Sequence, residues 1–283
     1  MMMKKNTIGI DIGGTTVKGA LFQGGGIVRE YDRPTNGKAG REAIFSALFS
    51  VIDELFLPGT PIGISSAGDI DPRTGECVYA TDNLKGWTGV KIAQTVSERY
   101  GVRCAADNDA VCALKGELRY YPELKNVTML TFGTGVGGAS LVNGEILRGK
   151  RFNAGRWGHV VLFPNGRKCS CGRRGCAEAY LSANAMTERG REVIPGLGGC
   201  KELFERGERG EAEAAALLRS FGEELCMLLD DIQTALAPEL ILLGGGLMKS
   251  EKTVKSMLGG RDNVAFARLG PRAGVYGAAS LIS

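Results

Sequence analysis

Three clusters of glycine each follow a short apolar segment, and this arrangement constrains the fold more than any other feature of the chain. The clusters lie at 11–16 (DIGGTT), 133–138 (GTGVGG) and 244–246 (GGG). Glycine makes up 43 of the 283 residues, about twice its usual share. Since 43% of the residues are hydrophobic and only 9 are proline, a collagen-like or disordered chain is excluded. The clusters therefore predict tight turns after strands in a folded protein.

The first two clusters each separate two segments with strand character. Residues 6–11 and 17–22 flank the first cluster, and 126–132 and 139–147 flank the second, with an Asn143-Gly144 turn in the last segment. Apolar spacing and helix-ending residues predict the other elements: helices at 40–56, 90–101, 109–121, 211–236 and 273–283, and strands at 61–71, 102–110 and 239–246.

Two halves that open in the same way predict a duplicated α/β fold with two lobes and a cleft between them. We expect the N-terminal lobe to contain residues 1–119 with 270–283, and the C-terminal lobe to contain 120–269.

Charge and hydropathy exclude several classes of partner. A net charge of +4 without long basic runs does not support nucleic-acid binding. No run of 18 apolar residues and no apolar signal core are present, so we expect neither a membrane span nor a secretory leader. The expected location is the cytoplasm, where the eight cysteines would be reduced, buried or bound to metal.

Glycine-rich turns let backbone N–H groups converge on phosphate oxygens. Gly133, Gly135 and Gly138 match G-x-G-x-x-G, but a strand follows them, which argues against a dinucleotide-binding helix. The sequence GxxxxGK[ST] is absent, which excludes the P-loop class.

The first cluster begins with Asp11, whose carboxylate could hold hydrated Mg²⁺ while Thr15, Thr16 and loop amides meet phosphates. Lys18 follows one strand turn later. The alternative is a plain hairpin in which Asp11 is only a capping residue.

The only histidine of the chain precedes three closely spaced cysteines. His159, Cys169, Cys171 and Cys176 give the pattern H-x9-C-x-C-x4-C, with Gly172 and Gly175 in the loop. Three thiolates and one imidazole suit tetrahedral Zn²⁺, and four protein ligands make such a site structural. The alternative is three reduced cysteines beside a buried histidine.

Several motifs, in order along nearly the whole chain from about residue 7 to 281, resemble the ROK family of sugar kinases and related repressors, in the actin-like ATPase superfamily. They are DIGGTTVKG (11–19), DNDA (107–110), GTGVGG (133–138), GHVV (158–161), CSCGRRGCAEAY (169–180) and LLGGG (242–246). The resemblance implies a two-lobe actin-like (ribonuclease H-like) fold and transfer of the γ-phosphate of ATP, with Mg²⁺, to a sugar hydroxyl. Family repressors carry a winged-helix domain before the first glycine loop, whereas only six residues precede the strand that leads into this loop here, so the kinase branch is implied.

The resemblance also assigns roles to individual residues. Asp109 would be the general base, although as a residue at a strand-to-helix junction it could simply cap the helix. Asp107 should point the other way from Asn108 along the strand. The implied sugar contacts are Gly68, Asn108, Asp109, His159 and Glu178, with Asn83 either lining the same cleft or serving as a turn residue. The implied nucleotide contacts are Asp11 (with Mg²⁺), Gly13, Gly14, Thr15, Thr16, Lys18, Gly133, Thr134, Gly135, Gly137, Gly138 and, near the adenosine, Gly244, Gly245 and Gly246. The zinc ligands coincide with the zinc signature of the family.

One position departs from the family pattern. Most ROK glucokinases have A-G-E-x-G-H before the zinc loop, whereas this chain has Arg156 in place of the glutamate. A carboxylate accepts hydrogen bonds from sugar hydroxyls, but a guanidinium can only donate. Arg156 therefore either selects an anionic, N-acylated or otherwise modified sugar, or turns away and pairs with a carboxylate, leaving a plain hexose pocket.

Two other functions remain open for such a chain. It could be a non-catalytic sugar sensor that retains the kinase fold, or an ATPase of the same superfamily without a sugar substrate. Intact Asp11, Asp109 and phosphate loops favour the kinase. The expected partners are a sugar and ATP, and the resemblance implies a homodimer.

Overall fold

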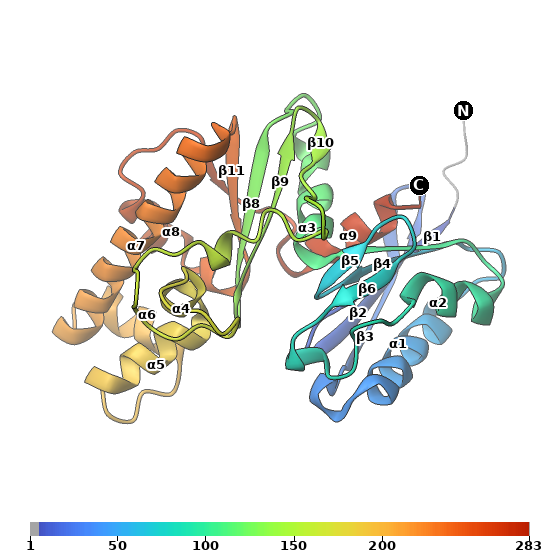
Figure 1. The fold of residues 1–283 in the computed structure, drawn as a ribbon, viewed down its shortest axis with the longest axis horizontal. Coiled ribbons are helices and arrows are strands. Elements are labelled where there is room, and N and C mark those ends of the chain that lie inside the picture. The colour runs from blue at the N-terminus through green and yellow to red at the C-terminus, as the bar shows by residue number, and fades with distance from the viewer. Residues whose placement is uncertain (1–5, 283) are drawn as a thin grey trace. The chain divides into compact units, whose positions relative to one another are not determined.

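The computed structural model describes residues 6–282, which divide into two compact units (Figure 1). Unit 1 comprises the described residues up to 122, residues 148–154 and those from 271 onwards. Unit 2 comprises Glu123–Leu147 and Gly155–Gly270. Within residues 6–282, none of the helices has the length and apolar character needed to cross a membrane.

Unit 1 is built on a five-stranded sheet. Its strands lie in the order β3 (Gly26–Pro34), β2 (Thr16–Gln23), β1 (Thr7–Ile12), β4 (Ile62–Ser66) and β7 (Cys104–Asn108). The first three form consecutive antiparallel hairpins, while β4 and β7 run parallel to β1. A small hairpin and four helices complete the unit: β5 (Asp69–Asp71), β6 (Glu76–Tyr79), α1 (Arg41–Leu55), α2 (Ile92–Tyr100), α3 (Asp109–Glu117) and α9 (Ala273–Ser280).

Helices cover both faces of this sheet because successive side chains of a strand point to opposite sides. Ile8, Ile10 and Ile12 of β1 are fully buried in the core that contains α1. On the other face Gly9 lies directly against Ala279 of α9, and α9 also contacts α3. The carboxyl ends of β1, β4 and β7 therefore share one edge of the sheet, beside the start of α3.

Unit 2 repeats this architecture. Its strands lie in the order β10 (Glu145–Ile146), β9 (Val136–Val142), β8 (Val127–Phe132), β11 (Leu240–Gly244) and β12 (Val264–Phe266). Again the first three are antiparallel and the last two run parallel to the strand that opens the unit. The same strand order in both units shows the internal duplication that the sequence predicts.

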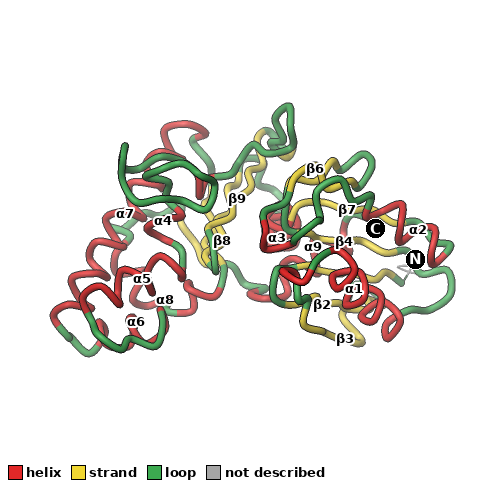
Figure 2. Tube along the Cα trace, turned by 60° about the horizontal axis from the view of Figure 1, so that its bottom comes forward, coloured by secondary structure: helices red, strands yellow, loops and turns green. Residues whose placement is uncertain are grey.

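The helices α4 to α8 lie together beside the sheet of unit 2 (Figures 1 and 2). They are α4 (Glu178–Leu181), α5 (Ala183–Val193), α6 (Cys200–Glu208), α7 (Ala212–Leu236) and α8 (Glu251–Met257). The long helix α7 buries Phe221, Leu225 and Leu228 in the core that also contains Leu130 and Leu243 of the central strands. This core fixes the strand ends from which the glycine loops of unit 2 emerge.

Candidate functional site

The first glycine cluster forms the turn between β1 and β2. Its amide at Gly13 donates to the carbonyl of Thr16 (3.1 Å), which closes the hairpin. The fully buried Thr35 holds the turn from outside, because its N–H donates to the Thr15 carbonyl (2.9 Å) and its hydroxyl to the Gly13 carbonyl (2.7 Å). Gly14 and Thr15 are exposed at the tip. The turn is thus held by hydrogen bonds at its base and exposed at the tip, where the sequence predicts phosphate contacts.

Asp11 lies at the end of β1, beside this turn, and is half-buried. Its Oδ1 accepts a hydrogen bond from the hydroxyl of Ser65 (2.6 Å), and Gly274 at the start of α9 brings the helix against the carboxyl group. Burial raises the pKa of Asp11, opposed by the Ser65 hydrogen bond and by the charge of Lys18, its cross-strand neighbour. A bound cation would favour the ionised form, and a carboxylate beside exposed loop oxygens fits a hydrated Mg²⁺ ion.

Asn108 and Asp109 form the corner at which β7 ends and α3 begins. The side chain of Asn108 caps the helix, since its Oδ1 accepts from the amides of Ala110 (3.0 Å) and Val111 (3.1 Å). Its Nδ2 donates to the Gly68 carbonyl (2.8 Å) and to Oδ1 of Asp109 (2.9 Å). Asn108, not Asp109, is therefore the capping residue, and it orients the carboxylate of Asp109.

The carboxyl group of Asp109 has a strongly shifted pKa. Its Oδ1 also accepts from the Ala110 amide (2.8 Å), while the residue as a whole is exposed at the end of the sheet. Desolvation by the surrounding protein and the negative charge of Asp11 raise the pKa of Asp109 to about 6. A carboxylate with such a pKa can accept a proton near neutral pH more readily than an ordinary one.

Gly68 and Asn83 lie on two loops beside this corner. Gly68 has φ 111°, and a Cβ there would approach the Tyr79 carbonyl to 2.7 Å, so the position requires glycine. Asn83 is exposed and lies against Gly14, whose Cβ would stand 3.4 Å from the carbonyl oxygen of Asn83. Unit 1 thus brings together every predicted residue between Asp11 and Asp109.

The second glycine cluster forms the turn between β8 and β9 in unit 2. Its amide at Gly133 donates to the Gly135 carbonyl (2.9 Å), and the Gly133 carbonyl accepts from Ala183 at the start of α5 (2.8 Å). Thr134 at the tip is exposed. The turn therefore matches the first glycine turn in its place between antiparallel strands.

Glu178 connects this turn to the cysteine loop. Its Oε2 accepts from the amide of Val136 (3.0 Å), and its Oε1 accepts from the hydroxyl of Ser170 (2.5 Å). A Cβ on Gly135 would stand only 2.5 Å from Oε2. The predicted sugar contact thus lies directly on the second glycine turn, a position that no local sequence pattern indicates.

The third cluster follows β11. Gly244 ends that strand, and Gly245 and Gly246 are exposed. A Cβ on Gly245 would stand 2.3 Å from the Phe132 carbonyl oxygen, so this backbone packs against the last residue before the second glycine turn. Unit 2 therefore places the second and third clusters side by side.

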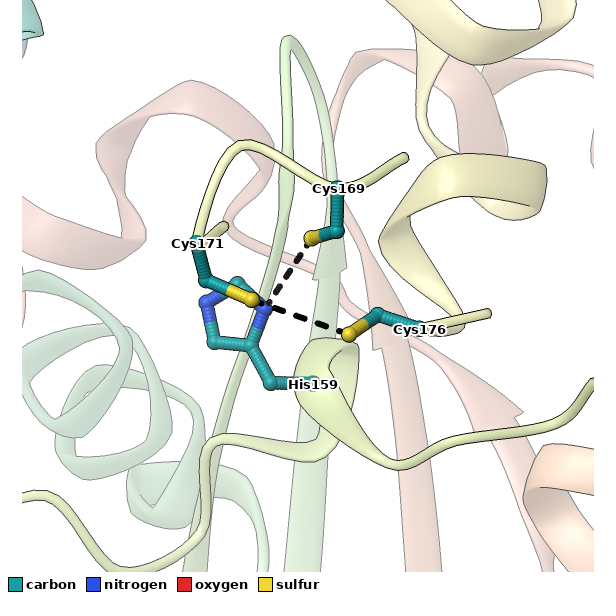
Figure 3. Close-up of side chains that lie close together, drawn as sticks. All are labelled: His159, Cys169, Cys171 and Cys176. Atoms are coloured by element: carbon teal, nitrogen blue, oxygen red, sulfur yellow. Dashed lines mark hydrogen bonds between the residues drawn. The ribbon is translucent and has the colours of Figure 1, made fainter. Parts of the chain in front are cut away.

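His159, the last residue of η4 (Trp157–His159), lies together with the three cysteines of the loop that leads to α4 (Figure 3). All four ligand atoms fall within 4.8 Å of one another. The Cys171 and Cys176 sulfurs are 3.7 Å apart, and the Cys169 sulfur is 3.6 Å from His159 Nδ1.

The Cys171–Cys176 and Cys169–His159 separations are those of a tetrahedral zinc site, and the wider limit of 4.8 Å over all four atoms requires a small inward shift to bind the ion. Zn–S bonds of about 2.3 Å and Zn–N bonds of about 2.0–2.1 Å place the ligand atoms about 3.5–3.8 Å apart. Burial lowers the pKa of His159, opposed by Glu178 and reinforced by the charges of Arg156 and Arg173, which favours the neutral imidazole that a metal needs. At Gly175 φ is 81°, and a Cβ would collide with the Phe163 carbonyl at 1.8 Å, so glycine allows the loop to close. The residues present therefore fit zinc, with Nδ1 as the histidine ligand.

Arg156 immediately precedes η4 and is half-buried in unit 2. Its positive charge helps to lower the pKa of His159. The guanidinium therefore lies close enough to act on one of the predicted sugar contacts of this unit. The substitution for glutamate therefore reverses the charge at this place.

Sequence reasoning did not find three residues that support the site. Ser65 binds Asp11, Thr35 holds the first glycine turn, and Arg148 forms an ion pair with Asp107 next to the Asn108–Asp109 corner. The predicted strand at 61–71 continued past Ser65, whereas β4 ends at Ser66, so the place of Ser65 near a strand end was not predicted. All three contacts join segments far apart in the sequence, for which no local pattern exists.

Comparison with known proteins identifies the family to which this arrangement corresponds. The model of the ROK family matches residues 7–283. The chain is 29% identical to a glucokinase from Thermotoga maritima, over 99% of this chain and 98% of that protein. It is 31% identical to an N-acetylmannosamine kinase from Salmonella arizonae, over 87% of this chain and 84% of that protein.

A solved structure supports the same assignment. A ROK family glucokinase from Streptomyces griseus, in complex with glucose and AMPPNP, superimposes with a TM-score of 0.82 at 26% identity, over 98% of each chain. The predicted α/β fold of the two-lobe actin-like ATPase class is thereby confirmed.

Proposed function

The chain belongs to the ROK family, and on that basis we propose that it is an ATP-dependent sugar kinase with Asp109 as its general base. It would transfer the γ-phosphate of ATP to a hydroxyl group of a hexose or hexose derivative. The observation that carries the proposal is the Asn108–Asp109 corner, which holds a carboxylate of raised pKa beside Asp11 and the first glycine turn. The kinases among its relatives support the same reaction class.

The reaction requires alignment, charge neutralisation and a proton acceptor. Asp109 accepts the proton of the sugar hydroxyl while that oxygen attacks the γ-phosphorus. The new O–P bond forms as the bond to the β-phosphate oxygen breaks, and ADP leaves with that electron pair. Because Asn108 holds Oδ1 of Asp109, the other oxygen, Oδ2, is the proposed acceptor.

The nucleotide contacts are proposed from the glycine turns. Amides and hydroxyls at Gly14, Thr15 and Thr16 would donate to phosphate oxygens, with Gly13 closing the turn beneath them and Lys18 contributing positive charge. In unit 2 the corresponding contacts are Gly133, Thr134, Gly135, Gly137 and Gly138, and the backbone at Gly244, Gly245 and Gly246 would pack near the adenosine. Asp11 would hold Mg²⁺, which supplies charge neutralisation to the phosphates when bound.

The sugar contacts proposed for each unit differ in chemistry. Unit 1 offers the Gly68 backbone, the Asn83 amide and the Asn108–Asp109 pair. Unit 2 offers Glu178, Arg156 and the Nε2 of His159, which is available because Nδ1 faces the cysteine sulfurs.

We further propose that Arg156 favours a sugar with an anionic or N-acyl substituent over glucose. A guanidinium donates charge-assisted hydrogen bonds to carboxylate and carbonyl oxygens but cannot accept from a hydroxyl. The relatives include glucokinases and N-acetylmannosamine kinases, so the charge reversal at Arg156 is the feature of this chain that selects between them.

The test measures ATP consumption with no sugar and with hexoses, N-acetylhexosamines, glycosides and uronic acids. We expect turnover that depends on sugar, with kcat/KM for the best modified sugar above that for glucose. In the Arg156→Glu variant, kcat/KM for glucose should rise relative to kcat/KM for the modified sugar. Glucose turnover equal to that of every modified sugar contradicts the role of Arg156. Consumption without sugar would identify an ATPase, and binding of sugar without turnover would identify a sensor.

The family resemblance also leads us to propose a homodimer. Sedimentation equilibrium of the purified protein tests this state, and a single species of 30.0 kDa would contradict it.

A further inference from the structure

A short segment of the chain belongs to unit 1 although both of its sequence neighbours belong to unit 2. Residues 148–154 follow β10 and precede the turn that leads to η4, yet they group with unit 1. The first of them, Arg148, donates to both carboxylate oxygens of Asp107, through Nη1 (2.5 Å) and Nη2 (2.7 Å). The paired carboxylate is on β7, one residue before the Asn108–Asp109 corner.

The carboxylate of this ion pair is almost completely removed from solvent, and the arginine is partly buried. The side chain of Asp107 is 1% exposed and that of Arg148 is 23% exposed. A buried pair of this kind often adds little net stability compared with apolar side chains of similar size, while a bidentate guanidinium fixes geometry closely. Relative to an apolar pair, the intact ion pair therefore contributes geometry more than stability, whereas removing Arg148 alone leaves the buried Asp107 unpaired and lowers stability as well.

Hydrogen bonds continue from the ion pair to the proposed base. Oδ1 of Asp107, which receives Arg148 Nη1, also accepts from the backbone N–H of Asn108 (2.8 Å). The side chain of Asn108 in turn donates to Oδ1 of Asp109 (2.9 Å). Arg148 is thus two residues and three hydrogen bonds away from Asp109, without touching it.

The same segment has a second attachment to unit 1. The ring of Phe152 lies under the guanidinium of Arg73, at 5.1 Å, and Arg73 binds the buried Asp71 through Nε (2.9 Å) and Nη2 (2.7 Å). This contact holds the far end of the segment, and within residues 6–282 neither Arg73 nor Asp71 shares a hydrogen bond with the Asn108–Asp109 corner. It therefore provides a matched control, since it fixes the same segment through another arginine.

We propose that Arg148 is a positioning residue for catalysis, which holds the Asn108–Asp109 corner through Asp107. This inference rests on the proposed function, because it takes Asp109 to be the general base. A small displacement of a reacting group by a distant substitution can lower the rate about 100-fold, so the effect should appear in kcat. The KM for ATP should stay close to its normal value, because the nucleotide contacts lie on other loops.

The experiment measures kcat and the KM values of Arg148→Gln, Arg148→Lys, Arg73→Gln and Asp109→Asn, with thermal unfolding of each. We expect kcat of Arg148→Gln to fall about 10- to 100-fold. Arg148→Lys, which keeps the charge but loses the two-pronged contact, should retain more activity. Arg73→Gln should stay near the normal rate. If Arg148→Gln fails to fold, the comparison of Arg148→Lys with Arg73→Gln gives the same contrast.

The double variant Arg148→Gln with Asp109→Asn distinguishes a positioning role of Arg148 from a general disturbance of the fold. If Arg148 acts through Asp109, adding Arg148→Gln to Asp109→Asn should lower the residual rate little further, because such residues act as a unit. A normal kcat for Arg148→Gln, an equal loss in Arg73→Gln, or a loss that is just as large in the Asp109→Asn background would overturn the inference. A normal rate for Asp109→Asn alone would instead refute the proposed function.

Discussion

Replacing Arg189 by methionine should destabilise unit 2 more than any surface substitution. Arg189 on α5 is 7% exposed and Glu224 on α7 is 6% exposed. They form a two-pronged ion pair with N–O distances of 2.6 and 2.8 Å, and Arg189 Nη1 also donates to the Tyr180 carbonyl of α4 (3.1 Å). The first residue of α5 also donates a hydrogen bond to the Gly133 carbonyl. The ion pair therefore stabilises a helix that contacts the second glycine turn.

The size of the loss in unfolding free energy follows from the burial of Glu224, the partner that remains. In Arg189→Met, Glu224 keeps its place in the core without its cation, and breaking a buried pair in this way costs about 3–5 kcal/mol. For a chain of this size that corresponds to a fall in Tm on the order of 10 °C. In the double variant with Glu224→Leu, both charges are gone, so most of the loss should be recovered.

The loss of stability in Arg189→Met should also depend on pH. Burial already raises the pKa of Glu224 above its usual value although Arg189 opposes the shift, and removing Arg189 should raise it further. A carboxyl group whose folded pKa lies above its unfolded pKa stabilises the folded state only while it is protonated. The deficit of Arg189→Met should therefore be smaller at pH 5 than at pH 7.5.

Urea unfolding at the two pH values tests these expectations for both variants and the unaltered protein. A cost below about 1 kcal/mol, as for exposed pairs, would refute the reasoning. So would a deficit that grows as the pH falls, or a double variant no more stable than Arg189→Met.

Three further predictions concern the site itself. Cys176→Ser should lose most of the bound zinc measured by plasma emission spectrometry and lower Tm, whereas Cys200→Ser should keep both; equal zinc content in the two variants would contradict the assigned ligands. Gly68→Ala should raise the sugar KM because a Cβ would meet the Tyr79 carbonyl at 2.7 Å, and an unchanged KM would exclude Gly68 from the sugar site. The kcat–pH profile should rise through about pH 6, since Asp109 must be ionised to accept a proton and its pKa is raised to about 6; a rate that is flat from pH 5 to 8 would contradict this.

Local patterns predicted the hairpins and the cysteine loop well. Glycine clusters between alternating segments correctly predicted the β1–β2 and β8–β9 hairpins, and the Asn143-Gly144 turn has φ values of 52° and 83°. The four residues with zinc-ligand spacing do converge. In each case the signal lies within about twenty residues of sequence, where turn chemistry and ligand spacing act directly.

Contacts between segments far apart in the sequence could not be predicted from local patterns. The edge strands β3 and β12 and the helices α4, α5 and α6 were not predicted, because their place depends on the core of each unit more than on their own sequence. Likewise, Asn and Asp are equally good helix caps, so only the structure shows that Asn108 caps α3 and holds Oδ1 of Asp109. The Asp107–Arg148 pair joins residues 41 positions apart, beyond any local pattern.

The central claim is that Asp109 is the general base of a sugar kinase. The most direct measurement is single-turnover phosphorylation of the best sugar by Asp109→Asn, with calorimetric titration of sugar binding. Removing a general base should slow phosphoryl transfer about 10²–10⁴-fold while sugar still binds. A transfer rate near that of the unaltered enzyme would contradict the account.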